Sequence, residues 1–202
     1  MSEKDFYSTI SQSSIAEFKD RGSRFLAYAY PIESIIDFKE RLQELKKEHA
    51  KAVHHCFAYR LGLDGNNFRV SDDGEPSGTA GKPILGQIDS KGLTNVLVIV
   101  VRYFGGTLLG VPGLINAYKT ATTMALQLMP IVQKPVTVRL QISFDYTQMN
   151  DIMRWIKVLN CEVVEQEMQL FCMIKTDVPK NRLTELKQLL SDMRGVEVQQ
   201  VK

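Results

Sequence analysis

Apolar residues recur along the chain with two periods, and each period predicts a kind of element. Residues 14–18 and 23–30 alternate between apolar and polar side chains, which predicts two short strands joined by a glycine-containing turn. Between residues 34 and 49 the apolar positions lie three and four apart, the spacing of one stripe of an amphipathic helix. Ser34 and Asp37 have the spacing of a capping box at the start of this helix.

The most apolar stretch of the chain is residues 93–101, which Val and Ile dominate. Such a run predicts a strand that is covered on both faces. Two further strands are expected over residues 53–61 and 68–71, and two further helices over residues 77–88 and 112–128. The later helix is expected to bury one stripe of residues, Leu114, Ala117, Tyr118, Ala121, Ala125 and Leu128. Pro112 suits the first turn of its helix because the missing N–H would have no partner there.

The last third of the chain has a rhythm of its own. Residues 129–135 contain two prolines and are expected to form a linker. Strands are expected after it over residues 137–145, 162–166, 169–175 and 196–201, and helices over residues 146–159 and 180–193. This β-α-β-β-α-β order is that of a ferredoxin-like sheet with two helices on one side. We therefore expect an α+β chain of two domains, residues 1–130 and 131–202.

The charge of the chain limits what it can attract. The net charge is +2, from 25 basic and 23 acidic residues, and each expected domain has a net charge of about +1. Nucleic acid would therefore have to be bound by a local patch and not by overall attraction. The second domain offers only Phe144 and Phe171 on its central strands, so we do not expect it to stack RNA bases directly.

The cysteines and the first residues indicate a cytoplasmic protein. Cys56, Cys161 and Cys172 are an odd set without C-x-x-C spacing, which argues against a disulfide framework and a structural zinc site. The charged start of the chain leads into no apolar run of signal-peptide length. No apolar segment is long enough to cross a bilayer as a helix.

A glycine-rich loop follows the apolar strand and is the first candidate for chemistry. Gly105 and Gly106 come just after Arg102 and Tyr103 and shortly before the helix that contains Pro112. Unpaired backbone N–H groups at a helix start attract anions, and Arg102 and Lys82 would add positive charge. The glycines can equally serve only a tight turn and close packing. The sequence leaves both interpretations open.

An acidic turn is the second candidate. Asp72, Asp73 and Glu75 lie within four residues beside Gly74 and Pro76. Three carboxylates on a turn can hold Mg²⁺ or supply acid and base groups. Alternatively they belong to a solvated turn, with Ser77 as the N-cap of the next helix.

His54 is the third candidate for a functional side chain, and Cys56 is not a candidate. The two side chains share one face of their strand, but residues two apart on a strand are separated by about 6.5 to 7 Å. Cys56 is therefore too far from His54 for direct activation and is interpreted as a half-buried thiol. Phosphate-binding and dinucleotide-binding glycine motifs are excluded, because the glycines around Lys82 and Gly105 have the wrong spacing.

Three motifs together resemble a known family. They are residues 54–60 (HHCFAYR), residues 71–81 (SDDGEPSGTAG) and residues 102–106 (RYFGG). The long middle motif is the most specific, and the chain resembles the YigZ/IMPACT family, in its bacterial two-domain form. The resemblance implies a first domain like ribosomal protein S5 domain 2 and a second like the last domains of elongation factor G. Eukaryotic members act as translational regulators.

This chain departs from the family pattern at two positions. Leu108 stands where the family usually has lysine, and Asn116 where it usually has arginine. Two positive charges are thus missing beside the candidate anion site, which weakens the expectation of phosphate binding.

The function expected from all this is non-enzymatic binding linked to translation, with RNA, the ribosome or a translation-associated protein as partner. The alternative is a metal-dependent hydrolase or transferase acting on a phosphorylated small molecule or nucleic acid, and a protein-interaction scaffold is a third possibility. We assign no catalytic or metal-binding residue, expect no cofactor, and leave the oligomeric state open. The expected binding residues are His54, Asp72, Asp73, Glu75, Lys82, Arg102, Tyr103, Gly105 and Gly106. This assignment requires that the acidic turn and the glycine loop lie close together and line one polar hollow.

Overall fold

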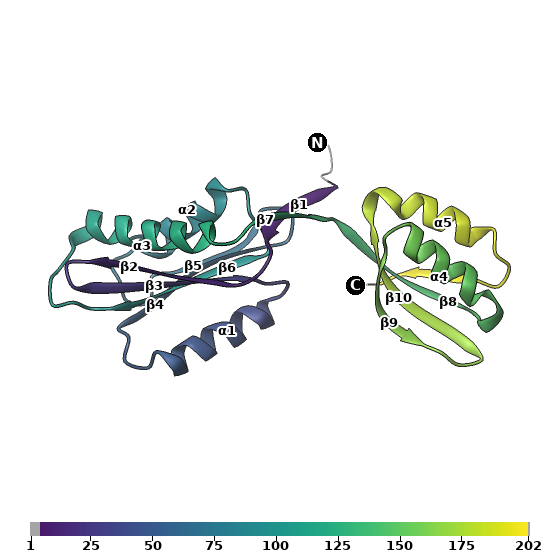
Figure 1. Ribbon diagram of the computed structural model, residues 1–202, viewed down its shortest axis with the longest axis horizontal. Coiled ribbons are helices and arrows are strands. Elements are labelled where there is room, and N and C mark those ends of the chain that lie inside the picture. The colour runs from purple at the N-terminus through teal and green to yellow at the C-terminus, as the bar shows by residue number, and fades with distance from the viewer. Residues whose placement is uncertain (1–4, 202) are drawn as a thin grey trace. The chain divides into compact units, whose positions relative to one another are not determined.

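The computed structural model describes residues 5–201 and confirms a mixed α+β architecture (Figure 1). The chain forms two compact units, one of residues 7–134 and one that contains residues 135–201. Buried apolar residues form separate clusters in each. Among the described residues, no helix is both long and apolar enough to span a membrane.

The first unit is built around a five-stranded antiparallel sheet of order β2-β3-β6-β4-β5. Its strands are β2 (Ser14–Asp20), β3 (Ser23–Pro31), β4 (His54–Leu61), β5 (Asn67–Ser71) and β6 (Val96–Tyr103). Three helices accompany it, α1 (Ile35–Glu48), α2 (Gly81–Ser90) and α3 (Gly110–Gln127). Figure 1 shows α2 and α3 on one face of the sheet and α1 on the other.

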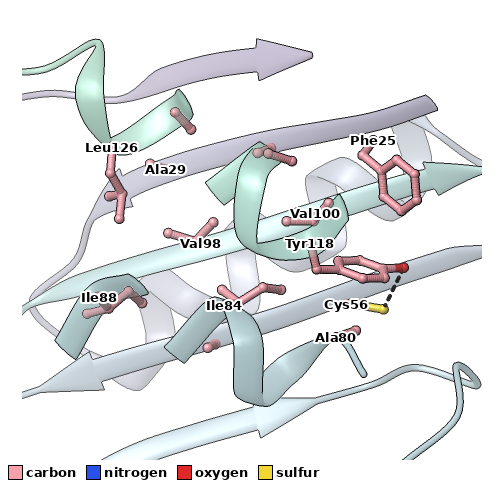
Figure 2. Packing of buried hydrophobic residues seen from close by; sticks show 14 of the residues in the cluster. Phe25, Ala29, Cys56, Ala80, Ile84, Ile88, Val98, Val100, Tyr118 and Leu126 are labelled. Atoms are coloured by element: carbon pink, nitrogen blue, oxygen red, sulfur yellow. Dashed lines mark hydrogen bonds between the residues drawn. The ribbon is translucent and has the colours of Figure 1, made fainter. Parts of the chain in front are cut away.

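The central strand β6 has the burial that its sequence predicts. Residues 96–102 are all buried, because alternate side chains enter the two cores on opposite faces of the sheet. Val98 and Val100 face α2 and α3, where Tyr118 packs edge-on against Phe25 with ring centroids 5.2 Å apart (Figure 2). Phe38 of α1 lies on the other face with Phe57.

Several local predictions are confirmed. The hairpin turn between β2 and β3 has positive φ at Arg21 and Gly22, 45° and 80°. At α1, Asp37 N–H donates to Ser34 Oγ and Ser34 N–H donates to the Asp37 carboxylate, which is the predicted capping box.

The two ends of the first unit differ from the prediction. Residues 129–135 were expected to be a linker, yet β7 (Ile131–Pro135) pairs with β1 (Phe6–Ile10), a strand that the sequence did not suggest. Proline is compatible with this strand because Pro135 is its last residue and the extended backbone suits its fixed φ. Ile10 is fully buried, so β1 belongs to the core.

Two other boundaries also move. The strand expected to begin at Leu93 begins at Val96, because Asn95 has a φ of 56° and interrupts the extended backbone. Leu128 was expected on the buried stripe of α3 but is 55% exposed, because the helix ends at Gln127 and Leu126 enters the core instead.

The second unit has the predicted β-α-β-β-α-β order. Its elements are β8 (Thr137–Asp145), α4 (Met149–Val158), β9 (Glu162–Glu167), β10 (Phe171–Pro179), α5 (Leu183–Ser191) and β11 (Glu197–Gln200). Short 3₁₀ turns, η1 (Tyr146–Gln148) and η2 (Lys180–Arg182), precede the two helices. The strands form an antiparallel sheet of order β11-β8-β10-β9, and both helices pack into one core on it.

Candidate functional site

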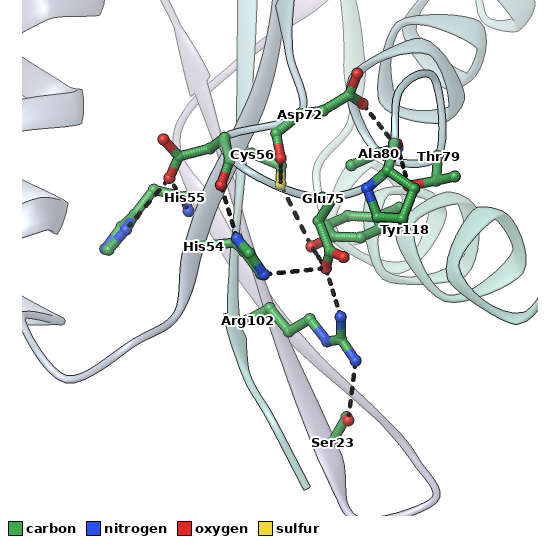
Figure 3. A network of polar contacts seen from close by, with 12 residues as sticks. Ser23, His54, His55, Cys56, Asp72, Glu75, Thr79, Ala80, Arg102 and Tyr118 are labelled. Carbon is green, nitrogen blue, oxygen red and sulfur yellow. Dashed lines mark hydrogen bonds and ion pairs between the residues drawn. The ribbon is translucent and has the colours of Figure 1, made fainter. Parts of the chain in front are cut away.

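A buried ion pair joins the acidic turn to the end of β6 (Figure 3). Arg102 Nη1 donates to Glu75 Oε1 over 2.6 Å, and the Tyr118 hydroxyl donates to the same oxygen over 2.7 Å. Glu75 and Arg102 are only 8% and 5% exposed. A buried charge is tolerated only when it is paired and hydrogen-bonded, and here the carboxylate has both kinds of partner.

Strand register and backbone conformation bring these groups together. Arg102 lies opposite His54 in the β6–β4 ladder, so the end of β6 meets the start of β4. The acidic turn follows β5, and Asp73 and Gly74 have φ values of 42° and 89° that fold it back. A side chain at Gly74 would put Cβ 3.3 Å from His54 Nδ1, so this position needs glycine for its backbone conformation as well as for space.

Asp72 holds the start of α2. Its Oδ1 accepts hydrogen bonds from the N–H groups of Ala80 and Gly81, and its Oδ2 accepts one from Gly78. Partial burial by itself would raise the pKa of Asp72, but these three N–H donors outweigh it and the pKa is lowered. The prediction that Ser77 caps this helix is wrong, because the helix begins at Gly81. The N–H groups at its start are instead bound by Asp72, which lies several residues earlier in the sequence.

Asp73 and the backbone around it attach the turn to β4. The Asp73 carboxylate accepts from the backbone N–H of His55 over 2.6 Å, and Lys46 Nζ lies 3.9 Å from its other oxygen. His54 Nδ1 donates to the Asp73 carbonyl over 2.7 Å. His54 Nε2 is left 3.9 Å from Glu75 Oε1.

Cys56 is more deeply buried than the half-buried thiol that the sequence suggested. Its side chain is fully inaccessible, and its thiol donates to the Asp72 carbonyl over 3.0 Å. Tyr118 Oη lies 3.3 Å away (Figure 2). Burial raises the pKa of the Cys56 thiol, so it stays protonated and is not a nucleophile.

The three carboxylates of the turn therefore point to three different sets of partners. Asp72 binds the start of α2, Asp73 binds β4, and Glu75 binds Arg102 and Tyr118. A magnesium site needs several oxygens around one point. Within residues 5–201, no group of three or more His, Cys, Asp or Glu side chains is placed to hold a metal ion. The geometry thus gives no support to the metal-dependent alternative.

The glycine loop is connected to the acidic turn through Ser23. Arg102 Nη2 donates to Ser23 Oγ over 3.4 Å, and the backbone N–H of Gly105 donates to the same oxygen over 3.2 Å. A Cβ on Gly105 would lie 1.9 Å from the carbonyl carbon of Gly22, so this glycine serves close backbone packing. The two expected segments do meet, but their meeting point is filled by buried side chains and is not an open polar hollow.

Other expected site residues lie away from this meeting point. Tyr103 belongs to the core on the α1 face of the sheet, where its hydroxyl is 2.9 Å from His49 Nδ1. Lys82 is exposed on the first turn of α2. Gly106 is exposed and has a φ of 87°. The structure thus brings together His54, the acidic turn, Arg102 and Gly105, but not Tyr103 or Lys82.

Two residues of the network were not singled out from the sequence as site residues. Ser23 had no signal beyond its place at the start of a strand. Tyr118 was assigned to the buried stripe of α3, which is correct, and a tyrosine among alanines is itself a signal because a buried hydroxyl needs a partner. Its partner is Glu75.

Comparisons with known proteins agree with the motifs. The Impact N-terminal domain model matches residues 21–126. The chain is 31% identical over 172 residues to "IMPACT family member YigZ" of Escherichia coli (strain K12), which covers 84% of each chain. It is 34% identical over 146 residues to "IMPACT family member YvyE" of Bacillus subtilis (strain 168), covering 72% of this chain and 67% of that one.

More distant matches extend the comparison. The chain is 35% identical over 100 residues to "Protein IMPACT" of Rattus norvegicus, covering 47% of this chain and 31% of that protein. A crystal structure of a hypothetical protein is 26% identical, with a TM-score of 0.77 over 99% of both chains. With its signature motifs, its matching domain and a relative that is 31% identical over 84% of both chains, the chain belongs to the IMPACT family.

Proposed function

We propose that this protein is a non-enzymatic binding and regulatory protein linked to translation, which contacts RNA, the ribosome or a translation-associated protein. Family membership supports the link, because eukaryotic members act as translational regulators. The observation that supports a non-enzymatic role is the buried Glu75–Arg102–Tyr118 network. A catalytic carboxylate must reach a substrate, whereas this one is closed off by its own partners.

The contact surface that we propose is the exposed loop of residues 104–108. The buried network contacts this loop at two points. Arg102 Cζ lies 5.6 Å from the centroid of the Phe104 ring, and the Gly105 N–H donates to Ser23 Oγ. In this proposal Glu75 supports the loop through Arg102, whereas His54, Asp72 and Asp73 hold the acidic turn that carries Glu75. Gly106, with its exposed backbone, completes the surface.

The chemistry of this loop favours apolar contact over phosphate contact. Phe104 is 47% exposed and Leu108 is 82% exposed, while the two basic positions common in the family are absent here. Each lysine or arginine that meets a phosphate adds about 0.7 to 0.9 to the slope of log affinity against log salt. A loop without lysine or arginine should therefore bind with a shallow salt dependence.

The domain assignments are part of the same proposal. An antiparallel sheet of order β11-β8-β10-β9 with two helices on one side supports a ferredoxin-like second domain, of the type at the end of elongation factor G. We assign the first unit to the ribosomal protein S5 domain 2-like class. The two domains expected as residues 1–130 and 131–202 are placed instead with their boundary after residue 134, because β7 pairs with β1. A fold of this kind serves many functions, so the argument for function remains with the loop.

Co-sedimentation with ribosomes tests the proposal. The full chain should sediment with ribosomes at low salt and less so at high salt, and Leu108→Glu should reduce the bound fraction. Ile36→Glu is the matched control, because Ile36 is also exposed, at 67%, but lies on α1. The proposal is wrong if the wild-type chain does not sediment at either salt concentration, or if both variants lose binding equally.

A further inference from the structure

Both helices of the second unit pack on one face of its sheet, and among residues 5–201 no helix of this unit covers the other face (Figure 1). On β8, Leu140, Ile142 and Phe144 point into the core with α4 and α5, and so do Cys172, Ile174 and Val178 of β10. Successive side chains of a strand point to opposite faces. The residues between them must therefore face the other way. Figure 1 shows both helices on one side of this sheet.

The open face is acidic. Strand register places Glu167, Met173, Ser143 and Glu197 in one row across it, and Glu165, Lys175, Gln141 and Gln199 in the next. A third row holds Glu162, Asp177 and Arg139. Five carboxylates thus share the face with two basic groups.

The two basic groups are already engaged by carboxylates of the same face. Arg139 makes a two-pronged contact with Asp177, both distances 2.7 Å, and Lys175 Nζ lies 2.7 Å from Glu165. In the part of the chain that the structure describes, no basic side chain lies within ion-pair distance of the exposed Glu162, Glu167 or Glu197. These three carboxylates give the face its uncompensated negative charge.

The opposite side of the same unit has the opposite sign. The two helices and the segments that flank them contain six basic residues, Arg154, Lys157, Lys180, Arg182, Lys187 and Arg194, against the three acids Asp151, Glu185 and Asp192. The near-neutral net charge of the unit therefore hides a separation of charge between its two sides. Nucleic acid would be repelled by the open face and attracted to the side of the helices.

Apolar side chains extend the open face at one end. Met173 lies in the row between Glu167 and Glu197. At the tip of the β9–β10 hairpin, Leu170 and Phe171 are 76% and 77% exposed, and Phe171 is paired with Asp145 next to the exposed Tyr146. Met and aromatic residues are typical of the centres of protein interfaces, and contiguous exposed apolar groups mark docking surfaces.

We propose that the open face of the second unit is a docking surface for a basic protein segment, in which lysine or arginine side chains alternate with apolar ones. The cations would meet Glu162, Glu167 and Glu197, and the apolar residues would pack on Met173 and Phe171. Charge complementarity selects this occupant over RNA. The surface contains none of residues 104–108, so this proposal and the proposed function can fail separately.

Fluorescence anisotropy with the full chain tests it. The probe is a short labelled peptide in which lysine alternates with leucine, and the same peptide with glutamate for lysine is its counterpart. The basic peptide should bind and the acidic one should not. The double variant Glu167→Lys with Glu197→Lys should raise the Kd about tenfold, because two attractive contacts become repulsive.

The matched control is Asp151→Lys with Asp192→Lys, which makes the same change in net charge on the helix side. It should leave the Kd within about twofold, since exposed charges farther apart than a Debye length are largely screened. Circular dichroism of both variants verifies folding. Equal loss of binding in the two double variants would overturn the proposal, as would no binding of the basic peptide by the wild-type chain.

Chemical-shift mapping gives an independent readout. The peptide should shift the amide signals of Met173, Lys175 and Gln141, which lie at the centre of the face. A labelled single-stranded RNA should leave them unchanged. The proposal is wrong if the RNA shifts these signals, or if the peptide shifts only signals of α4 and α5.

Discussion

Removing the Glu75 carboxylate is expected to destabilise the first unit selectively. In Glu75→Ala, Arg102 would keep its charge at a side chain that is 6% exposed, and the Tyr118 hydroxyl would lose its acceptor. Breaking a buried, hydrogen-bonded ion pair on one side costs about 3–5 kcal/mol. Because small domains are stable by only about 5–15 kcal/mol, this is a large part of the total.

The chain contains a convenient way to measure this. Its one tryptophan, Trp155, packs against the core of the second unit, whereas circular dichroism reports on both units. In urea unfolding, Glu75→Ala should shift the circular dichroism transition to lower urea and leave the tryptophan fluorescence transition in place. Equal shifts of both signals would show that the effect is not local to the first unit.

A paired variant separates the cost of an orphaned charge from the cost of the altered packing. Glu75→Leu with Arg102→Met removes both charges and replaces them with apolar side chains of similar length. Such replacements are often nearly neutral, so the double variant should recover most of the stability lost in Glu75→Ala. The reasoning is refuted if Glu75→Ala costs less than about 1 kcal/mol, or if the double variant is less stable than the single one.

Three further predictions concern the stability of the first unit. Gly105→Ala should lower the free energy of unfolding by about 3 kcal/mol or more, because its Cβ would lie 1.9 Å from the carbonyl carbon of Gly22. Gly86→Ala in α2 should raise it by about 0.5–1 kcal/mol, because the added Cβ has no atom within 4 Å. Urea unfolding measures both changes. Asp72→Asn should lower the free energy of unfolding by about 1–2 kcal/mol at neutral pH. Because the pKa of Asp72 is lowered in the folded state, the carboxylate stabilises the fold above the unfolded pKa of about 4, and this stabilisation is lost as the pH falls through the folded pKa. An Asp72→Asn chain with the wild-type acid dependence would contradict this. Burial lowers the pKa of His55, so the contribution of this group to stability is full above the unfolded pKa of about 6.5 and falls below it. In thermal melts between about pH 7 and 5, His55→Gln should therefore lose less stability than the wild type. An equal loss in both would show that other groups cause the fall.

Much of the fold could be predicted because period and capping act locally. The α1 capping box, the hairpin turn at Gly22 and the two-sided burial of β6 follow from residues a few positions apart. The β1–β7 pair could not be predicted, because it joins segments at the two ends of the first unit and neither has strong alternation. Its stability comes from tertiary packing of residues such as Ile10.

The sequence predicted which residues belong to the candidate site better than it predicted what each of them does there. The motifs identified Asp72, Glu75, Arg102 and Gly105, and the structure brings these together. What the sequence could not indicate is where each side chain points. Whether a carboxylate faces solvent or an arginine depends on register and on the backbone turn at Asp73, which nonlocal contacts determine.

The pairing of β1 with β7 has a consequence for how the chain folds during synthesis. Because β1 is made first and β7 lies more than 120 positions later, the first unit cannot complete its structure until residues 131–135 have left the ribosomal exit tunnel. A recombinant fragment that stops at residue 130 would lack this last strand, and β1 would be left with exposed backbone donors and acceptors that invite intermolecular association. Expression trials of the isolated unit should therefore extend through Pro135.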